Sequence, residues 1–220
     1  MAPTSSEQTV HIPVAGLRLE GVLAIPADAR GIVLFAHGSG SSRHSPRNNY
    51  VARVLQDAGI GTLLFDLLTA EEDVDYRARF DIGLLIERLV AVTRWLQRQP
   101  QASALAIGYF GASTGAAAAL GAAAELGPAI AAVVSRGGRP DLAEPVLWQV
   151  RSPTLLIVGE LDVEVLQLNR QAYALLEAEK RLAIVPGATH LFEEAGTLEQ
   201  AARLAAAWFK DHLKPAVKTL

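Results

Sequence analysis

Residues 104–126 read ALAIGYF (104–110), GASTG (111–115) and AAAALGAAAEL (116–126). The uncharged first run predicts a buried strand at 104–110, and the alanine-rich run predicts a helix at 113–126 packed on a sheet. Between them lies the pattern G-x-S-x-G, which places Ser113 on a sharp strand-to-helix turn with its hydroxyl exposed. Small neighbours suit that turn, because larger side chains would clash with the strand or the helix. An ordinary glycine-bounded loop has the same composition, so a nucleophilic role for Ser113 depends on partners elsewhere.

The composition favours a single domain over 1–220, with loosely held ends at about 1–8 and 214–220. The chain has 220 residues, half of them hydrophobic, and a formal net charge of −3. A domain of this size buries enough surface to need no disulfide or metal. It contains no cysteine. This excludes disulfides, cysteine-ligated metals and a cysteine nucleophile, and it is in keeping with a cytoplasmic protein.

Charge and hydropathy argue against several classes of partner. Residues 1–8 lack the basic and apolar regions of a signal peptide. No apolar stretch reaches the length of a membrane span, and the charges are mixed without a basic block. We therefore expect neither membrane nor nucleic acid as a partner. A small-molecule substrate and water are expected instead, and a homodimer is left open.

The rest of the chain alternates between predicted strands and helices. An N-terminal hairpin is predicted over 9–13 and 17–26. The further strands are predicted at 31–36, 61–66, 130–135, 154–158 and 181–185. The further helices are predicted at 46–58, 81–99, 163–179 and 198–213, with an acidic loop at 69–76. This alternation predicts an α/β fold with a mostly parallel sheet, an antiparallel N-terminal hairpin, helices on both faces and no lid domain.

Two partners for Ser113 follow later strands. The carboxyl ends of parallel strands meet at one edge of a sheet, so residues after different strands converge there. Asp162 and His190 follow the fifth and the last parallel strand, giving the chain order Ser, Asp, His. His190 is predicted as the general base and Asp162 as the group that orients it.

Other interpretations of these two residues stay open. His190 is equally typical of a solvated loop, and Asp162 is a preferred cap for the helix at 163–179. Glu160 lies nearer to the strand than Asp162 and is a rival acid, and Asp66 is a weaker one.

The loop HGSG at 37–40 follows the first parallel strand and predicts an oxyanion site. The first donor should be the Thr114 amide, which directly follows the nucleophile at a helix N-terminus. The second should be the amide of Ser39, with Gly40 as the runner-up. A generic glycine- and serine-rich loop is the alternative.

Residues on the strand-end loops are candidates for substrate binding. They are Gly38, Gly40, Arg43, His44 and Arg136. The cations among them could hold a substrate carboxylate. Ion pairs of the arginines with Asp141 or Glu71 are expected at least as much as this substrate role. Only residues 136–152 separate two strands at the position where larger lids are inserted. The site should therefore be open and admit small or medium esters.

Four motifs in register carry a resemblance to a known family. They are HGSG (37–40), GASTG (111–115), GELD (159–162) and GATH (187–190). From residue 21 to 213 the chain resembles the α/β-hydrolase superfamily and, within it, the dienelactone hydrolase-like group. The resemblance implies a serine esterase or related acyl hydrolase that works through an acyl-enzyme without metal or organic cofactor.

One departure from that group bears on the substrate. Dienelactone hydrolases proper carry a cysteine where this chain has Ser113, which favours a carboxylesterase. The alternatives are a lactonase, dienelactone hydrolase-like enzyme, thioesterase, amidase or perhydrolase, or a non-catalytic binding protein of the same fold.

Overall fold

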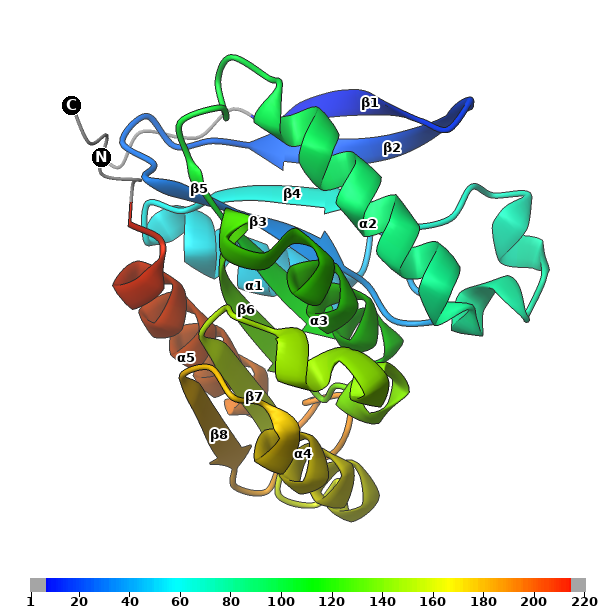
Figure 1. Cartoon of the computed structure of the whole chain (residues 1–220). Helices are drawn as coiled ribbons and strands as arrows, with labels where there is room; N and C mark the ends of the chain where they lie inside the picture. The colour runs from blue at the N-terminus through cyan, green and yellow to red at the C-terminus, as the bar shows by residue number, and fades with distance from the viewer. Residues whose placement is uncertain (1–6, 215–220) are drawn as a thin grey trace.

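An eight-stranded sheet lies between two layers of helices in the computed structural model, which describes residues 7–214 (Figure 1). The strands are β1 (Gln8–Val14), β2 (Leu17–Ala24), β3 (Gly31–Ala36), β4 (Gly61–Phe65), β5 (Ala106–Ala112), β6 (Ile130–Arg136), β7 (Thr154–Gly159) and β8 (Lys180–Val185). The α-helices are α1 (Pro46–Asp57), α2 (Ile82–Gln97), α3 (Thr114–Leu126), α4 (Val163–Leu175) and α5 (Thr197–His212). Short 3-10 helices are η1 (Glu72–Val74), η2 (Ala78–Phe80), η3 (Gly127–Ala129) and η4 (Pro140–Gln149).

The sheet topology confirms the predicted α/β fold. The strand order is β1-β2-β4-β3-β5-β6-β7-β8, and every pair from β4 to β8 is parallel. Strands β1 and β2 form the predicted antiparallel hairpin, and β2 also pairs antiparallel with β4. The hairpin turns at Ala15 and Gly16, both with positive φ, as a tight turn between twisted strands requires.

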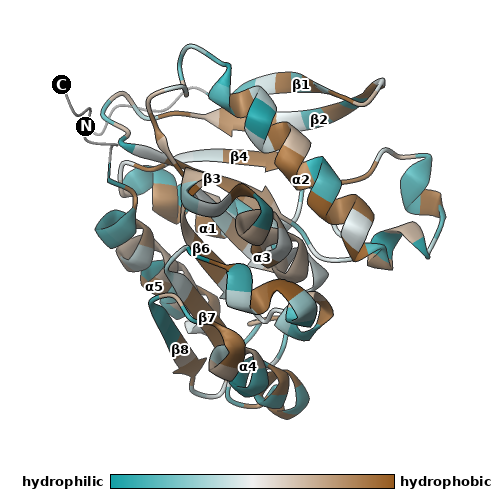
Figure 2. Ribbon diagram, in the orientation of Figure 1, coloured by the Kyte–Doolittle hydropathy of each residue, from teal (hydrophilic) through white to brown (hydrophobic). Residues whose placement is uncertain are grey.

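Helices α1 and α5 cover one face of the sheet, and α2, α3 and α4 cover the other. All six residues of β3 are buried, since helices lie on both its faces. Hydrophobic residues gather on the inner strands and on the helix faces toward them (Figure 2). Two apolar layers thus hold the central strands, whose carboxyl ends carry the predicted site residues.

Capping residues set the starts of two helices where the sequence places them. Ser45 Oγ accepts a hydrogen bond from the Asn48 amide at 3.3 Å, and Pro46 occupies the first helical position of α1. The Asp81 carboxylate accepts from the Leu84 amide at 3.0 Å and begins α2.

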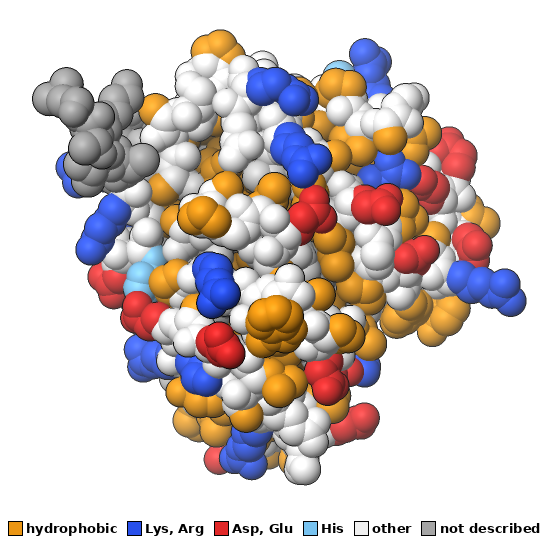
Figure 3. Space-filling model, in the orientation of Figure 1, with side chains coloured by type: hydrophobic (Ala, Val, Ile, Leu, Met, Phe, Trp, Pro, Cys, Tyr) orange, Lys and Arg blue, Asp and Glu red, His pale blue; other side chains and the backbone are white. Residues whose placement is uncertain are grey.

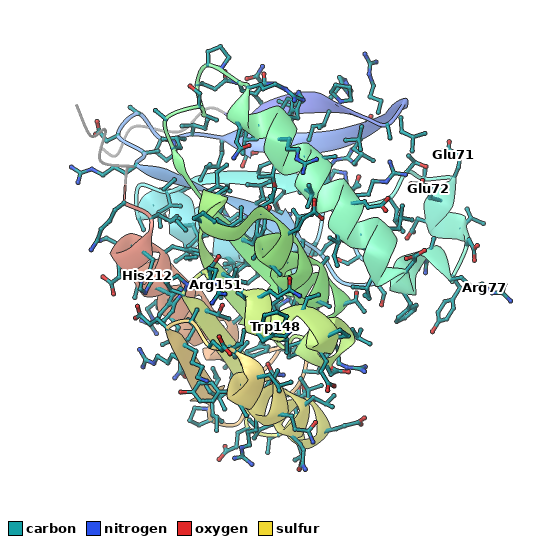
Figure 4. All side chains as sticks on the ribbon, in the orientation of Figure 1. Glu71, Glu72, Arg77, Trp148, Arg151 and His212 are labelled. Carbon is teal, nitrogen blue, oxygen red and sulfur yellow. The ribbon has the colours of Figure 1, made fainter. Side chains whose placement is uncertain are left out.

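Strand β5 is shifted by two residues from the predicted 104–110 to Ala106–Ala112, and two other segments differ more. Helix α4 ends at Leu175 instead of 179, because Leu176 turns extended and buries its side chain in the core. The connection from β4 to α2, predicted as an acidic loop, contains η1 and η2. It projects from the sheet, with Glu71, Glu72 and Arg77 on it (Figure 4). The ion pair of Glu72 with the buried Arg88, at 2.6 Å, anchors this connection to α2.

Charged side chains of both signs are interspersed on the face seen in Figure 3. Within residues 7–214, no helix has the length and apolar character needed to cross a bilayer. Most of the ends that the sequence predicts to be loosely held lie outside the described residues, although Gln8 already belongs to β1.

Helix α3 approaches β3 so closely that position 115 has no room for a side chain. A Cβ on Gly115 would lie 2.1 Å from the Ala36 carbonyl oxygen and 2.5 Å from that of His37. These are backbone atoms of the last residue of β3 and of the residue after it, which cannot move aside as a flexible side chain can. We expect Gly115→Ala to lower the free energy of unfolding by about 3 kcal/mol, as measured by urea denaturation.

The matched control for this substitution is Gly83→Ala, at an exposed position in the first turn of α2. A Cβ there would meet only the Asp81 carboxylate, at 3.4 Å. We expect a change within about 1 kcal/mol, because alanine favours helix over glycine. Equal stabilities of the two variants would contradict the close contact between α3 and β3.

Candidate active site

Ser113 is the single residue between β5 and α3. Its backbone has φ 51° and ψ −123°, a strained conformation for a residue with a side chain. The Ser113 carbonyl accepts from the amides of Ala116 at 3.1 Å and Arg139 at 3.0 Å, and its own amide donates to the Arg136 carbonyl at 3.4 Å. These bonds hold the turn that presents the half-buried serine at the carboxyl edge of the sheet.

Asp162 and His190 meet across the ends of β7 and β8. His190 Nδ1 lies 2.7 Å from Asp162 Oδ2, and the two side chains are 37% and 13% exposed. A carboxylate beside Nδ1 keeps the proton on that nitrogen in the neutral ring, which leaves Nε2 free to accept a proton. Asp162 is also the N-cap residue of α4, yet its side chain makes no cap bond. The geometry therefore favours the orienting role over the capping role.

The His190 ring lies beside the backbone that holds Ser113. A Cβ built on Gly137 would be 3.5 Å from His190 Nδ1, and the preceding residue, Arg136, binds the Ser113 amide. Ser113 Oγ makes no hydrogen bond with His190 within the described residues. Such bonds are often long in ligand-free enzymes and tighten when substrate binds.

The two rival acids have other partners. Glu160 accepts a hydrogen bond from the Gly187 amide at 2.9 Å. Asp66 accepts from the Arg43 amide at 2.7 Å and pairs with its guanidinium. Asp162 is thus the carboxylate that faces the histidine.

The loop at 37–40 runs beside Ser113. A Cβ on Gly38 would lie 3.0 Å from Ser113 Cβ, and Gly40 adopts φ 67°. The Ser39 amide, however, donates to Thr114 Oγ1 at 2.9 Å. Of the two amides predicted as oxyanion donors, that of Thr114 has no partner within residues 7–214, and that of Ser39 is already engaged.

His37 fixes this loop, a role that the sequence did not reveal. Its Nε2 accepts from the Leu67 amide at 3.0 Å, so the proton must be on Nδ1, which donates to the Gly38 carbonyl at 3.0 Å. Burial lowers the pKa of His37 and keeps the ring neutral. A histidine directly after a buried strand and before glycine is the signal that could have identified it.

The three predicted cationic contacts differ sharply in their surroundings. Arg43 forms ion pairs with Glu20 and Asp66, and His44 is exposed. Arg136 is only 7% exposed, and its Nε and Nη1 atoms have no hydrogen-bond partner among residues 7–214. Its guanidinium lies 5.5 Å from the centre of the Phe192 ring.

The charge of Arg136 is retained despite this burial. Burial, with the nearby charge of Arg47, lowers the pKa of Arg136 to about 10, so the guanidinium stays charged at neutral pH. Asp141, one predicted partner, pairs with Arg139 instead.

The chain is similar to proteins of known family and fold. The model of the dienelactone hydrolase family matches residues 19–216. A crystal structure of a dienelactone hydrolase from Anabaena variabilis is 56% identical, with a TM-score of 0.93 over 96% of this chain and 99% of that one. Est1E from Butyrivibrio proteoclasticus has a TM-score of 0.79 over 92% of this chain and 98% of its own, at 15% identity, and thus shares the fold.

A curated relative carries a different name. A Mycobacterium tuberculosis protein provisionally named a phosphoribosyl transferase is 57% identical over 211 residues, which are 96% of this chain and 48% of that protein. The chain thus spans about half the length of this relative. From the family model and the Anabaena structure together, the chain belongs to the dienelactone hydrolase family and has the α/β-hydrolase fold.

Proposed function

We propose that this protein is a serine hydrolase that cleaves carboxylic esters of small to medium acyl chain. The observation that carries the proposal is the 2.7 Å hydrogen bond between His190 and Asp162, at the sheet edge where Ser113 occupies a strained turn. Membership of a hydrolase family supports the reaction type. The ester as substrate is our inference from the serine nucleophile.

In the proposed mechanism, Ser113 Oγ attacks the ester carbonyl carbon while its proton passes to His190 Nε2. The π electrons of the carbonyl move onto its oxygen, which the Thr114 amide stabilises. The intermediate then collapses as the bond to the alcohol breaks, and the alcohol oxygen takes the proton from His190. Water then attacks the acyl carbonyl carbon while one of its protons passes to His190 Nε2. The bond from that carbon to Ser113 Oγ breaks, the carboxylic acid leaves, and Ser113 Oγ takes the proton back from His190.

The transferase name of the mycobacterial relative does not define this chain's chemistry. That name belongs to a protein with about as much chain outside the match as within it. We assign hydrolysis to the matched stretch, because in this chain that stretch contains Ser113, Asp162 and His190.

We also propose Arg136 as the residue that holds an anionic group of the substrate. Arg43 already has two carboxylate partners, whereas Arg136 has none within residues 7–214. Its backbone binds the Ser113 amide, and its side chain lies over Phe192, two residues after the base. A buried charge without a partner is costly, so an anion there would be bound strongly.

A matched pair of esters tests both proposals. The wild type should hydrolyse p-nitrophenyl butyrate and p-nitrophenyl hemisuccinate without any phosphoribosyl donor. Arg136→Gln should raise KM for the anionic hemisuccinate by roughly 10- to 100-fold, as expected for a charge-assisted hydrogen bond. Its KM for the neutral butyrate should change less than about threefold.

The control is Arg94→Gln, because Arg94 forms an exposed ion pair with Glu125 on the helical surface. It should change neither KM. Lack of wild-type activity on both esters would contradict the esterase proposal. An equal change in KM for both esters in Arg136→Gln would contradict only the role of Arg136.

A further inference from the structure

The side chain of Thr114 makes a contact that an oxyanion site built only from backbone amides does not explain. Its Oγ1 accepts the hydrogen bond of the Ser39 amide, across 75 positions of sequence. Thr114 is 3% exposed and begins α3 directly after the nucleophile. The amide expected to face the substrate oxygen therefore faces a hydroxyl of the adjacent helix.

The hydroxyl hydrogen of Thr114 has no acceptor among the described residues. A hydroxyl has one hydrogen to donate, and buried polar groups usually use theirs. Thr93 in α2 shows the ordinary arrangement, because its Oγ1 donates to the Leu89 carbonyl four residues earlier at 2.7 Å. Thr114 makes no such bond to Phe110, since α3 starts at Thr114 and Phe110 belongs to β5. Its hydrogen is thus available at the point where the helix begins.

We propose that the Thr114 hydroxyl is the second oxyanion donor, in place of the Ser39 amide. The Ser39 N–H donates to Thr114 Oγ1, and the Thr114 O–H donates to the carbonyl oxygen of the substrate. The Thr114 N–H is the other donor to the same oxygen. This inference rests on the proposed function, because it assigns a residue to the acyl-transfer step at Ser113.

The position of Thr114 suits this pair of bonds. The amide and the hydroxyl belong to one residue, and backbone amides at helix N-termini are known to bind anions. The N-terminal end of α3 adds the positive end of the helix dipole. A hydroxyl that accepts a hydrogen bond also becomes a better donor, because bonds in a chain polarise one another.

Ser39 and His37 then position the hydroxyl. His37 binds the Gly38 carbonyl and the Leu67 amide, and these two bonds fix the loop. The Ser39 amide of the same loop then binds Thr114 Oγ1. As Ser113 attacks, negative charge develops on the substrate oxygen and both Thr114 bonds strengthen. Thr114 keeps its hydrogen throughout, and in this attack step the proton passes from Ser113 to His190.

Thr114→Val tests the proposal, because valine keeps the shape and the amide and removes the hydroxyl. With p-nitrophenyl butyrate, kcat should fall by about 10²- to 10³-fold, the usual cost of losing one oxyanion donor, with KM within about threefold. Thr114→Ser restores the hydroxyl and should bring kcat back to within about fivefold of the wild type. The affinity for a trifluoromethyl ketone, which mimics the oxyanion, should follow kcat across these variants.

The matched control is Thr62→Val. Thr62 is fully buried in β4, and its Oγ1 accepts a hydrogen bond from Gln56 at 2.8 Å, away from the site. It should leave kcat unchanged, which separates the loss of an oxyanion donor from the loss of any buried hydroxyl. Melting temperatures of all variants are recorded, and Thr114→Ala takes the place of Thr114→Val if the latter does not fold.

Retention of kcat within about tenfold in the variant that lacks the hydroxyl would overturn the proposal and return the role to the Ser39 amide. So would an unchanged trifluoromethyl ketone affinity. The kcat values of the variants are compared with that of a wild-type protein that hydrolyses the ester. An inactive wild type therefore counts against the proposed function, and an active Thr114→Val variant counts against this inference alone.

Discussion

Replacing Ser113 with alanine is expected to lower kcat for p-nitrophenyl butyrate by about 10⁶-fold, the scale seen when a triad nucleophile is removed. Without Oγ no acyl-enzyme can form, and residual turnover depends on the oxyanion donors alone. The fold should persist, because the turn is held by the backbone bonds of Ser113 to Ala116, Arg136 and Arg139. Steady-state kinetics with a circular dichroism melt of the same sample would measure both effects.

Ser103→Ala is the control for this loss. Ser103 is exposed, and its hydroxyl donates to the Pro100 carbonyl before β5. We expect wild-type kcat and KM from it. A Ser113→Ala variant that is folded and keeps more than about one hundredth of wild-type kcat would remove Ser113 from the mechanism.

The second large effect is expected from Asp162→Asn, with a loss of about 10⁴-fold in kcat. An amide NH₂ facing His190 Nδ1 would donate to it and move the ring proton to Nε2, which then cannot accept the proton of Ser113. Stability should change little, since the Asp162 side chain makes no cap bond to α4. Substrate binding should also persist, so the loss should appear in kcat and leave KM nearly unchanged.

Glu160→Gln is the matched control, because it is the same kind of substitution two residues away. The Glu160 side chain binds the Gly187 amide, a bond that the glutamine oxygen can keep. We expect less than a tenfold change in kcat. A large loss of kcat in Glu160→Gln with little change in Asp162→Asn would make Glu160 the acid of the site. The contact between Asp162 and His190 would then have no part in catalysis.

The contact of Asp162 with His190, at the sheet edge where Ser113 also lies, could be predicted because it follows from topology. Each residue comes after a different parallel strand, and all such strands end at one edge of the sheet. The glycine-bounded pattern indicated the turn at Ser113, since its small residues match the close approach of α3 to β3. Helix starts were also predictable, because Ser45 and Asp81 cap their helices locally.

What could not be predicted depends on side chains brought together by the fold. The Ser39–Thr114 bond joins the loop after β3 to the first residue of α3, and the two are adjacent only because β3 and β5 are neighbours. Arg43 forms ion pairs with Glu20 of β2 and with Asp66, which follows β4, so its side chain is not free to bind substrate. The two carboxylates are close because β2 and β4 pair antiparallel. No periodicity or motif in the sequence indicates either of these contacts.

Covalent labelling by a fluorophosphonate tests Ser113 as the nucleophile directly, when the labelled residue is located by mass spectrometry of the intact protein and its peptides. We expect one adduct, on Ser113, that is absent in Ser113→Ala and forms far more slowly in Asp162→Asn. An adduct on another residue, or an unlabelled wild-type protein, would contradict it.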